Sequence, residues 1–110
     1  MSVARKLFEY AMRTADDRIV QCPAGKRWVI TSIFACNTAA AATTFRLHHA
    51  YAGRASATSN ALFYDVRIAA NTTVELLEVA RLPMNANEDL RGLASAANIT
   101  LTGYGYEEDA

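Results

Sequence analysis

Hydrophobic and polar residues alternate with a period of two along much of the chain. The clearest case is residues 61–68, where Leu62, Tyr64, Val66 and Ile68 alternate with Ala61, Phe63, Asp65 and Arg67. A period of two places successive side chains on opposite faces of a β-strand. We therefore expect strands that bury one face and expose the other, as in an antiparallel sandwich, with Leu62 and Tyr64 pointing into the core.

Eight segments carry this strand pattern. They are residues 7–13, 18–22, 27–37, 43–51, 61–68, 73–82, 89–94 and 99–107. Two regions, 4–14 and 87–97, also fit a short helix, but a strand is favoured because a lone helix would need its own place on a sandwich. Turn-forming residues separate the segments at intervals of about 8–12 residues. The sequence predicts an all-β fold, an antiparallel β-sandwich of jelly-roll type with about eight strands, in a single domain over residues 1–110.

The segment 28–36 is apolar on both faces near its middle, at Val29, Ile30, Ile33 and Phe34. This pattern is typical of a central strand that is covered on both sides. A neighbouring subunit could supply the second cover. Because the chain is also rich in alanine and low in charge, we expect a homo-oligomer, with a trimer as the first expectation.

The predicted core depends on relatively few large side chains. Hydrophobic residues make up 52% of the chain, but many of them are alanines, which bury little surface each. The large candidates are Trp28, Ile30, Phe34, Phe45, Leu47, Leu62, Tyr64, Ile68, Leu76 and Leu101. Such a core gives modest stability, which association between copies would increase.

The charge pattern argues against two classes of partner. The chain has 11 basic and 11 acidic residues, and its basic runs are only Arg5-Lys6 and Lys26-Arg27. Nucleic-acid binding proteins normally carry a basic stripe, so no nucleic-acid partner is expected. Apolar runs stay far below the ~20 residues that span a bilayer, so no membrane partner is expected. The acidic residues 107–109 are interpreted as a solvated end.

The beginning of the chain and the cysteines bear on the compartment. Residues 1–12 lack the continuous apolar stretch of a signal peptide, so we expect synthesis and folding in a cytoplasm. Cytoplasmic thiols stay reduced. Cys22 and Cys36 are therefore predicted to be buried, unpaired thiols.

The two histidines are candidates for a metal or acid–base centre. His48 and His49 are adjacent, so on a strand their rings point to opposite faces and cannot share a metal ion. The serines of residues 56–59 lack a nucleophile-elbow motif. Gly25-Lys26 follows Pro-Ala and lacks the remaining residues of a phosphate-binding loop, so it is interpreted as a hairpin turn.

Paired carboxylates occur at Asp16-Asp17, Glu75/Glu78, Glu88-Asp89 and Glu107-Glu108. Most are interpreted as solvated surface charge at turns and ends, because a glycosidase would need two acids across a cleft. We therefore expect no enzyme activity, no catalytic residue, no cofactor-binding residue and no metal site.

An ordered set of short motifs runs from residue 18 to residue 108. It comprises Cys22-Pro23-Ala24-Gly25-Lys26 before a strand, Asn37-Thr38 before an alanine-rich loop, Asn71-Thr72-Thr73, and Ser95-Ala96-Ala97-Asn98-Ile99-Thr100 before the last strand. In order and spacing, this set resembles a family of small virion proteins of tailed bacteriophages and prophages. In that family a valine usually stands where this chain has Cys22.

The resemblance implies a structural role in a phage particle. It could be a capsid decoration (cement) protein, a head spike, or a neck or tail component. The expected location is the virion after synthesis in the host cytoplasm, and the expected partners are other copies and the major capsid or tail/neck proteins. The loops 38–44 and 53–60 are candidate contact segments.

A neck, tail or head-spike component could instead bind a carbohydrate or a receptor. Sandwich lectins use exposed aromatic residues for such binding. On that alternative, Tyr51, Tyr104 and Tyr106 would form an exposed platform.

Overall fold

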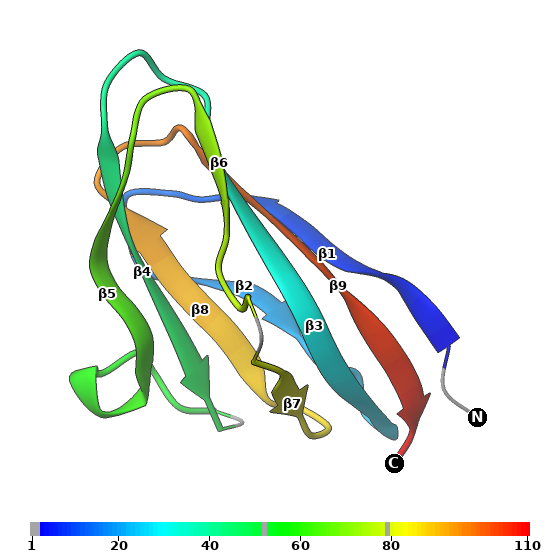
Figure 1. Ribbon diagram of the computed structural model, residues 1–110. Coiled ribbons are helices and arrows are strands. Elements are labelled where there is room, and N and C mark those ends of the chain that lie inside the picture. The colour runs from blue at the N-terminus through cyan, green and yellow to red at the C-terminus, as the bar shows by residue number, and fades with distance from the viewer. Residues whose placement is uncertain (1–2, 52, 79) are drawn as a thin grey trace.

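The computed structural model describes residues 3–51, 53–78 and 80–110, and within them it has nine β-strands (Figure 1). The strands are β1 (Val3–Ala11), β2 (Asp17–Gln21), β3 (Lys26–Asn37), β4 (Thr43–Ala50), β5 (Ala61–Ile68), β6 (Thr72–Glu75), β7 (Leu82–Met84), β8 (Asp89–Ala94) and β9 (Ile99–Asp109). A 3-10 turn, η1 (Thr58–Asn60), precedes β5. The two regions that could have been helical, 4–14 and 87–97, form strands β1 and β8, as favoured.

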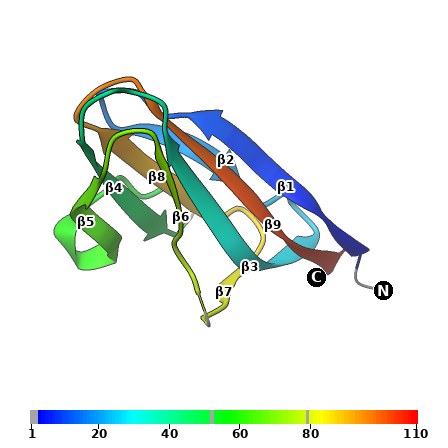
Figure 2. The same cartoon turned by 45° about the horizontal axis from the view of Figure 1, so that its top comes forward.

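The strands form two antiparallel sheets. The five-stranded sheet has the order β1-β9-β3-β6, with β7 also paired to β3, and the four-stranded sheet has the order β2-β8-β4-β5. Figure 2 shows the two sheets as separate layers. Apart from the short β7, this strand order is that of a jelly roll, in which most connections cross between sheets. The predicted all-β sandwich is therefore confirmed.

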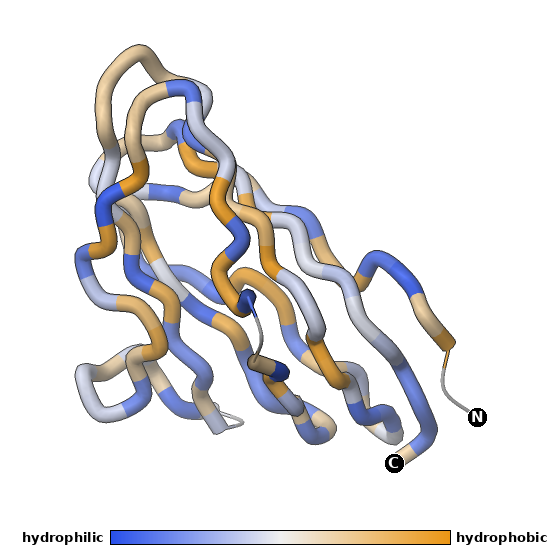
Figure 3. Tube along the Cα trace, viewed as in Figure 1, coloured by the Kyte–Doolittle hydropathy of each residue, from blue (hydrophilic) through white to orange (hydrophobic). Residues whose placement is uncertain are grey.

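The core lies between the two sheets. Its largest fully buried side chains include Phe45, Met12, Ile30, Ile33 and Leu101. Figure 3 shows hydrophobic and hydrophilic positions alternating along the strands, which is why each sheet has an apolar inner face. No helix in the described residues is long and apolar enough to cross a membrane.

The prediction that Leu62 and Tyr64 point into the core is wrong. Asp65 has a left-handed backbone (φ 53°), and opposite it the register of β4 against β5 shifts between Phe45 and Leu47. A bulge adds one residue to a strand, so the inward positions change parity. Phe63 therefore packs against the core, while Leu62 and Tyr64 are exposed.

A second bulge changes the orientation of Phe34. The register of β3 against β9 shifts between Ile30 and Ser32, so Ile30 and Ile33 are both buried although they are three residues apart. Phe34 then faces outward and is exposed, contrary to the prediction that it belongs to the core. The other large predicted core residues are buried, except Leu76, which is partly buried against the core.

The predicted strand 73–82 is two strands separated by a turn. The side-chain Oε2 of Glu75 accepts hydrogen bonds from the backbone amides of Leu77 (2.5 Å) and Glu78 (3.0 Å). These amides would otherwise continue the ladder, and Glu78 has a left-handed backbone (φ 48°). The chain therefore leaves the sheet after β6 and returns as β7.

The Pro-Ala-Gly turn was interpreted as a hairpin, and this is a further correction. The Lys26 amide donates to the Pro23 carbonyl (3.2 Å), and Gly25 has a positive φ of 77°, as the turn requires. However, β2 belongs to the four-stranded sheet and β3 to the five-stranded sheet. The turn therefore connects the two layers of the sandwich.

The Asn-Thr corner after β3 is fixed by a buried amide. Asn37 is fully buried, and its Nδ2 donates to the carbonyls of Ala41 (2.9 Å), Ile68 (3.1 Å) and Ala69 (3.3 Å). Its Oδ1 accepts from the Ala39 amide (3.0 Å). One side chain thus joins the alanine-rich loop to the end of β5, so that loop is held against the fold.

Candidate functional site

The outer face of the five-stranded sheet exposes three aromatic side chains. Phe34, Tyr104 and Tyr106 are 39%, 41% and 42% exposed. Phe34 and Tyr104 meet edge to face, with ring centroids 6.2 Å apart. Soluble proteins rarely leave contiguous aromatic surface uncovered without a use for it. We call this outer face, centred on Phe34, Tyr104 and Tyr106, the tyrosine face.

The register places mainly uncharged residues around these rings. Val29 pairs with Tyr106, Ser32 with Tyr104, and Phe34 with Thr102. In β1, which borders β9, Lys6 and Glu9 form an ion pair with each other (2.9 Å). Charge borders this aromatic centre on both sides, with Lys6 of β1 opposite Tyr104 and Glu75 of β6 opposite Phe34.

A shallow hollow of about 330 Å³ lies on the tyrosine face between β1 and β9, along Tyr104 and Tyr106. Tyr51 does not join these two tyrosines. It follows β4 of the opposite sheet, is 71% exposed, and lines a different hollow with His49 and Leu62. The expected platform of three tyrosines is therefore not formed.

The acidic residues 107–109 were expected to be a solvated end, and the structure corrects this. They form the last part of β9 and pair across the sheet: Arg5 with Glu107 (3.2 Å), Arg27 with Glu108, and Lys26 with Asp109 (2.7 Å). The indole of Trp28 also donates to Glu107 (2.8 Å). Antiparallel pairing of β3 with β9 brings the basic turn and the acidic end together.

These contacts lower carboxyl pKa values. The hydrogen bond from Trp28 holds the pKa of Glu107 below its usual range, and the hydrogen bond from Lys26 does the same for Asp109. A hydrogen bond from Arg46 likewise lowers the pKa of Asp65. All three groups favour the charged form in the folded chain.

We expect the protein to lose stability in acid. Because the folded pKa values lie below the unfolded ones, the contribution of these carboxylates is complete above a pH of about 4 and disappears as the pH falls below it. Thermal melting between pH 7 and pH 3 should show a falling midpoint mainly in the lower part of that range. The Glu107→Gln variant should melt lower at neutral pH and respond less to acid; an equal response in both proteins would contradict the assignment.

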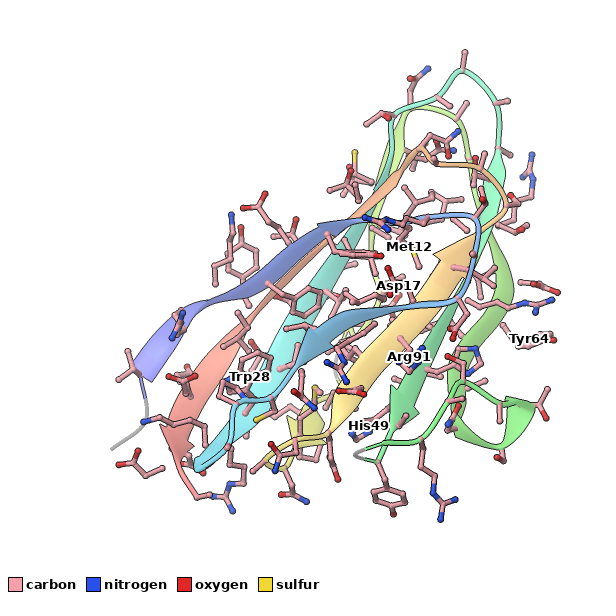
Figure 4. The ribbon with its side chains drawn as sticks, turned by 180° about the vertical axis from the view of Figure 1, so that it is seen from behind. Met12, Asp17, Trp28, His49, Tyr64 and Arg91 are labelled. Atoms are coloured by element: carbon pink, nitrogen blue, oxygen red, sulfur yellow. The ribbon has the colours of Figure 1, made fainter. Side chains whose placement is uncertain are left out.

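On the outer face of the four-stranded sheet, one arginine–carboxylate pair joins β4 to β5 and another joins β8 to the loop before β2. Arg46 holds Asp65 through Nε (2.6 Å) and Nη2 (3.2 Å). Arg91 donates to Asp16 Oδ2 (3.0 Å), and the Ser56 hydroxyl donates to Asp16 Oδ1 (2.5 Å). Figure 4 shows Arg91 on β8 and Tyr64 at the β5 edge of the sheet.

The two histidines face opposite sides of β4 and have separate partners. His48 contacts the Ala57 carbonyl and Asn60 Oδ1 through Nδ1, both at 2.9 Å, and His49 Nε2 contacts Glu88 Oε1 at 2.8 Å. Among the described residues, no group of three His, Cys, Asp or Glu side chains is placed to hold a metal ion.

Glu88 and Asp89 are buried, which corrects their interpretation as solvated charge. Glu88 accepts from His49 and from the Asn85 amide (3.0 Å), and Asp89 forms an ion pair with Arg18 Nε (3.2 Å). Ser59 lines the same hollow as His49, but no hydrogen bond joins them in the described part of the chain. A serine nucleophile needs that contact with its base.

The thiols are both free, and they differ in burial. Cys22 is fully buried and its Sγ lies 3.5 Å from the Lys26 carbonyl oxygen. Burial raises the pKa of the Cys22 thiol, which keeps it protonated and unreactive. Cys36 is only partly buried, so the expectation of two buried thiols holds for Cys22 alone.

The sequence was compared with protein families and with curated proteins. A scan of protein-family models finds none that matches the chain. A search of curated proteins finds no match either.

Proposed function

We propose that the protein is a structural subunit of a bacteriophage virion, most simply a capsid decoration (cement) protein. In this proposal it associates with other copies and with the particle surface. The observation that carries the proposal is the tyrosine face, a cluster of exposed aromatic side chains on the outer side of the five-stranded sheet. The order of motifs in the sequence, which resembles small phage virion proteins, supports the same role.

The size of the tyrosine face suits reversible association. Four strands about 4.8 Å apart and eight residues at about 3.3 Å each give a face of roughly 500 Å². A standard interface buries about 800 Å² per partner. The tyrosine face alone therefore favours a weak contact, which would be strengthened when several copies bind one particle.

The free energy of burying the three aromatic rings also indicates a weak contact. Burying the exposed two-fifths of three aromatic side chains removes roughly 180–300 Å² from water, which gives about 4.5–7.5 kcal/mol. Association itself costs about 4–15 kcal/mol. The three rings thus provide much of the driving force, and the neighbouring threonines and Val29 must provide the rest.

Binding to a particle can be tested directly. We expect the tagged protein to retain the major capsid protein, or a neck or tail protein, from a lysate of the phage-producing host. Electron microscopy of the particle should then show it on the surface of that component. If neither capsid nor tail proteins were retained, the virion role would be contradicted. A Tyr104→Lys variant should retain less of the same partner, while Tyr64→Lys should retain as much as the original.

A second candidate is a neck, tail or head-spike component that binds a carbohydrate or a receptor. One observation favours it: Tyr64 is exposed beside a polar hollow on the four-stranded sheet, on the opposite side of the sandwich from the tyrosine face. A subunit could therefore be attached by one face and bind a ligand with the other.

A further inference from the structure

A hollow of about 260 Å³ opens on the outer face of the four-stranded sheet, between β4, β5 and the loop before β5. Its lining includes Asp16, Arg46, His48, Ser56, Thr58 and Tyr64. In Figure 4, Tyr64 projects from the β5 edge that borders this region. The tyrosine face belongs to the other sheet, so association through that face leaves the hollow open.

The charges around the hollow cancel. Arg46 is paired with Asp65 and Arg91 with Asp16, so two cations face two carboxylates. An anionic ligand would compete with Asp16 and Asp65 for the arginines. A cationic ligand would be repelled by Arg46. The electrostatics therefore favour an uncharged ligand.

The polar groups offer both hydrogen-bond acceptors and donors. Both partners of His48 Nδ1 are acceptors, the Ala57 carbonyl and Asn60 Oδ1, so this nitrogen carries the proton. In the neutral ring, Nε2 is then an acceptor. The Ser56 hydroxyl donates to Asp16 and keeps its lone pairs, and the Tyr64 hydroxyl can donate or accept. A ligand that carries several hydroxyl groups matches this mixture.

An aromatic ring completes the hollow. Tyr64 is 47% exposed, and the Arg46 guanidinium lies 4.1 Å from its ring centroid. Asp65 holds that guanidinium through two hydrogen bonds, so the ring and its neighbour are already fixed before a ligand arrives. Arg46 covers one face of this ring, so the part that remains exposed is the surface that can attract the slightly positive C–H groups of a sugar ring.

We propose that this hollow binds a neutral sugar residue, with the ring of the sugar against Tyr64 and its hydroxyl groups on His48, Ser56 and Asp16. The hollow is somewhat smaller than drug-sized sites of about 300–1,000 Å³, so it accommodates one sugar unit, either free or at the end of a glycan. This inference rests on the second candidate function, for which it names the class of ligand, and not on the assembly role, because it uses the opposite face of the sandwich.

The test is a titration followed by amide chemical shifts in nuclear magnetic resonance spectra. The probes are the methyl glycosides of glucose, galactose, mannose and N-acetylglucosamine, with glucose 6-phosphate and glucosamine as charged controls. At least one neutral glycoside should shift the amides of residues 56–58 and Tyr64, with a Kd in the range of about 1–10 mM. The charged controls should bind more weakly than their neutral counterpart.

Variants separate this site from the tyrosine face. Tyr64→Ala should weaken binding at least tenfold, whereas Tyr104→Ala should leave it unchanged. If Tyr64→Ala failed to fold, the positions of the shifted amides in the original protein would still show whether the sugar binds at this hollow. Three results would overturn the proposal: no shifts with any neutral glycoside at about 50 mM, shifts centred on Tyr104 and Tyr106, or tighter binding of a charged sugar.

Discussion

Replacing Gly105 by alanine is expected to destabilise the fold more than any other single substitution proposed for this chain. Gly105 lies in β9 opposite Ile30 of β3, beside the bulge in that strand. A β-carbon at this position would overlap the backbone carbonyl oxygen of Val29 and would lie 2.9 Å from the Ile30 Cα. A backbone obstacle cannot rotate away as a side chain can, so β3 and β9 would have to separate locally.

The expected cost of Gly105→Ala exceeds about 3 kcal/mol, which is a large part of the stability of a small domain. Circular dichroism and thermal melting should show either no cooperative transition or a strongly lowered midpoint. Gly25→Ala is the matched control. A β-carbon at Gly25 would meet no other atom, so the only cost is the strain of an alanine at a positive φ of 77°. That control should cost about 1 kcal/mol. Equal melting of the two variants would contradict the close approach of β3 and β9.

The Tyr104→Lys variant is expected to dissociate the oligomer without unfolding the chain. Tyr104 is at the centre of the tyrosine face and touches Phe34. A lysine there removes an aromatic contact and places a second positive charge opposite Lys6 at the centre of the interface. Central aromatic residues of interfaces typically contribute about 2 kcal/mol or more, so the dissociation constant should rise at least about 30-fold.

Tyr64→Lys is the matched control for this prediction. Tyr64 is similarly exposed but lies on the four-stranded sheet. Sedimentation velocity at several concentrations should show a smaller species for Tyr104→Lys and the original species for Tyr64→Lys, with unchanged circular dichroism for both. The opposite pattern would move the association surface to the four-stranded sheet.

The alternation of the sequence predicted the sandwich because a period of two needs only local information. Bulges defeat the same argument, since one added residue exchanges the two faces of a strand. Asp65 at a positive φ could have warned of this in β5, because aspartate tolerates that conformation better than most residues. In β3 the added residue lies near Thr31, and nothing local distinguishes it from its neighbours.

The tyrosine face was only partly predictable. The sequence predicted a strand around Val29 and Phe34 that is covered on both faces, whereas in the structure Phe34 lies exposed on its outer side. The contribution of Tyr104 and Tyr106 depends on β9 lying beside β3, which is a long-range pairing. The same holds for the ion pairs of the acidic end, whose basic partners are 81 to 102 positions away.

The polar hollow could not be predicted from the sequence at all. Its residues come from the segment before β2, from β4, from the loop before β5 and from β5 itself. Each is a common surface residue, and only the packing of the loop onto the sheet brings them together. His48 and His49 are adjacent in the sequence, but their side chains point to opposite sides of β4. His48 lines the hollow, whereas His49 contacts Glu88.

The central claim, self-association through the exposed aromatic side chains of the tyrosine face, is tested most directly by the mass of the protein in solution. Light scattering coupled to gel filtration should be carried out across the micromolar range. We predict a mass that is a multiple of the 12.0 kDa chain, with three copies as the first expectation, and dissociation toward one copy on dilution. A mass of 12.0 kDa at every micromolar concentration would contradict the account.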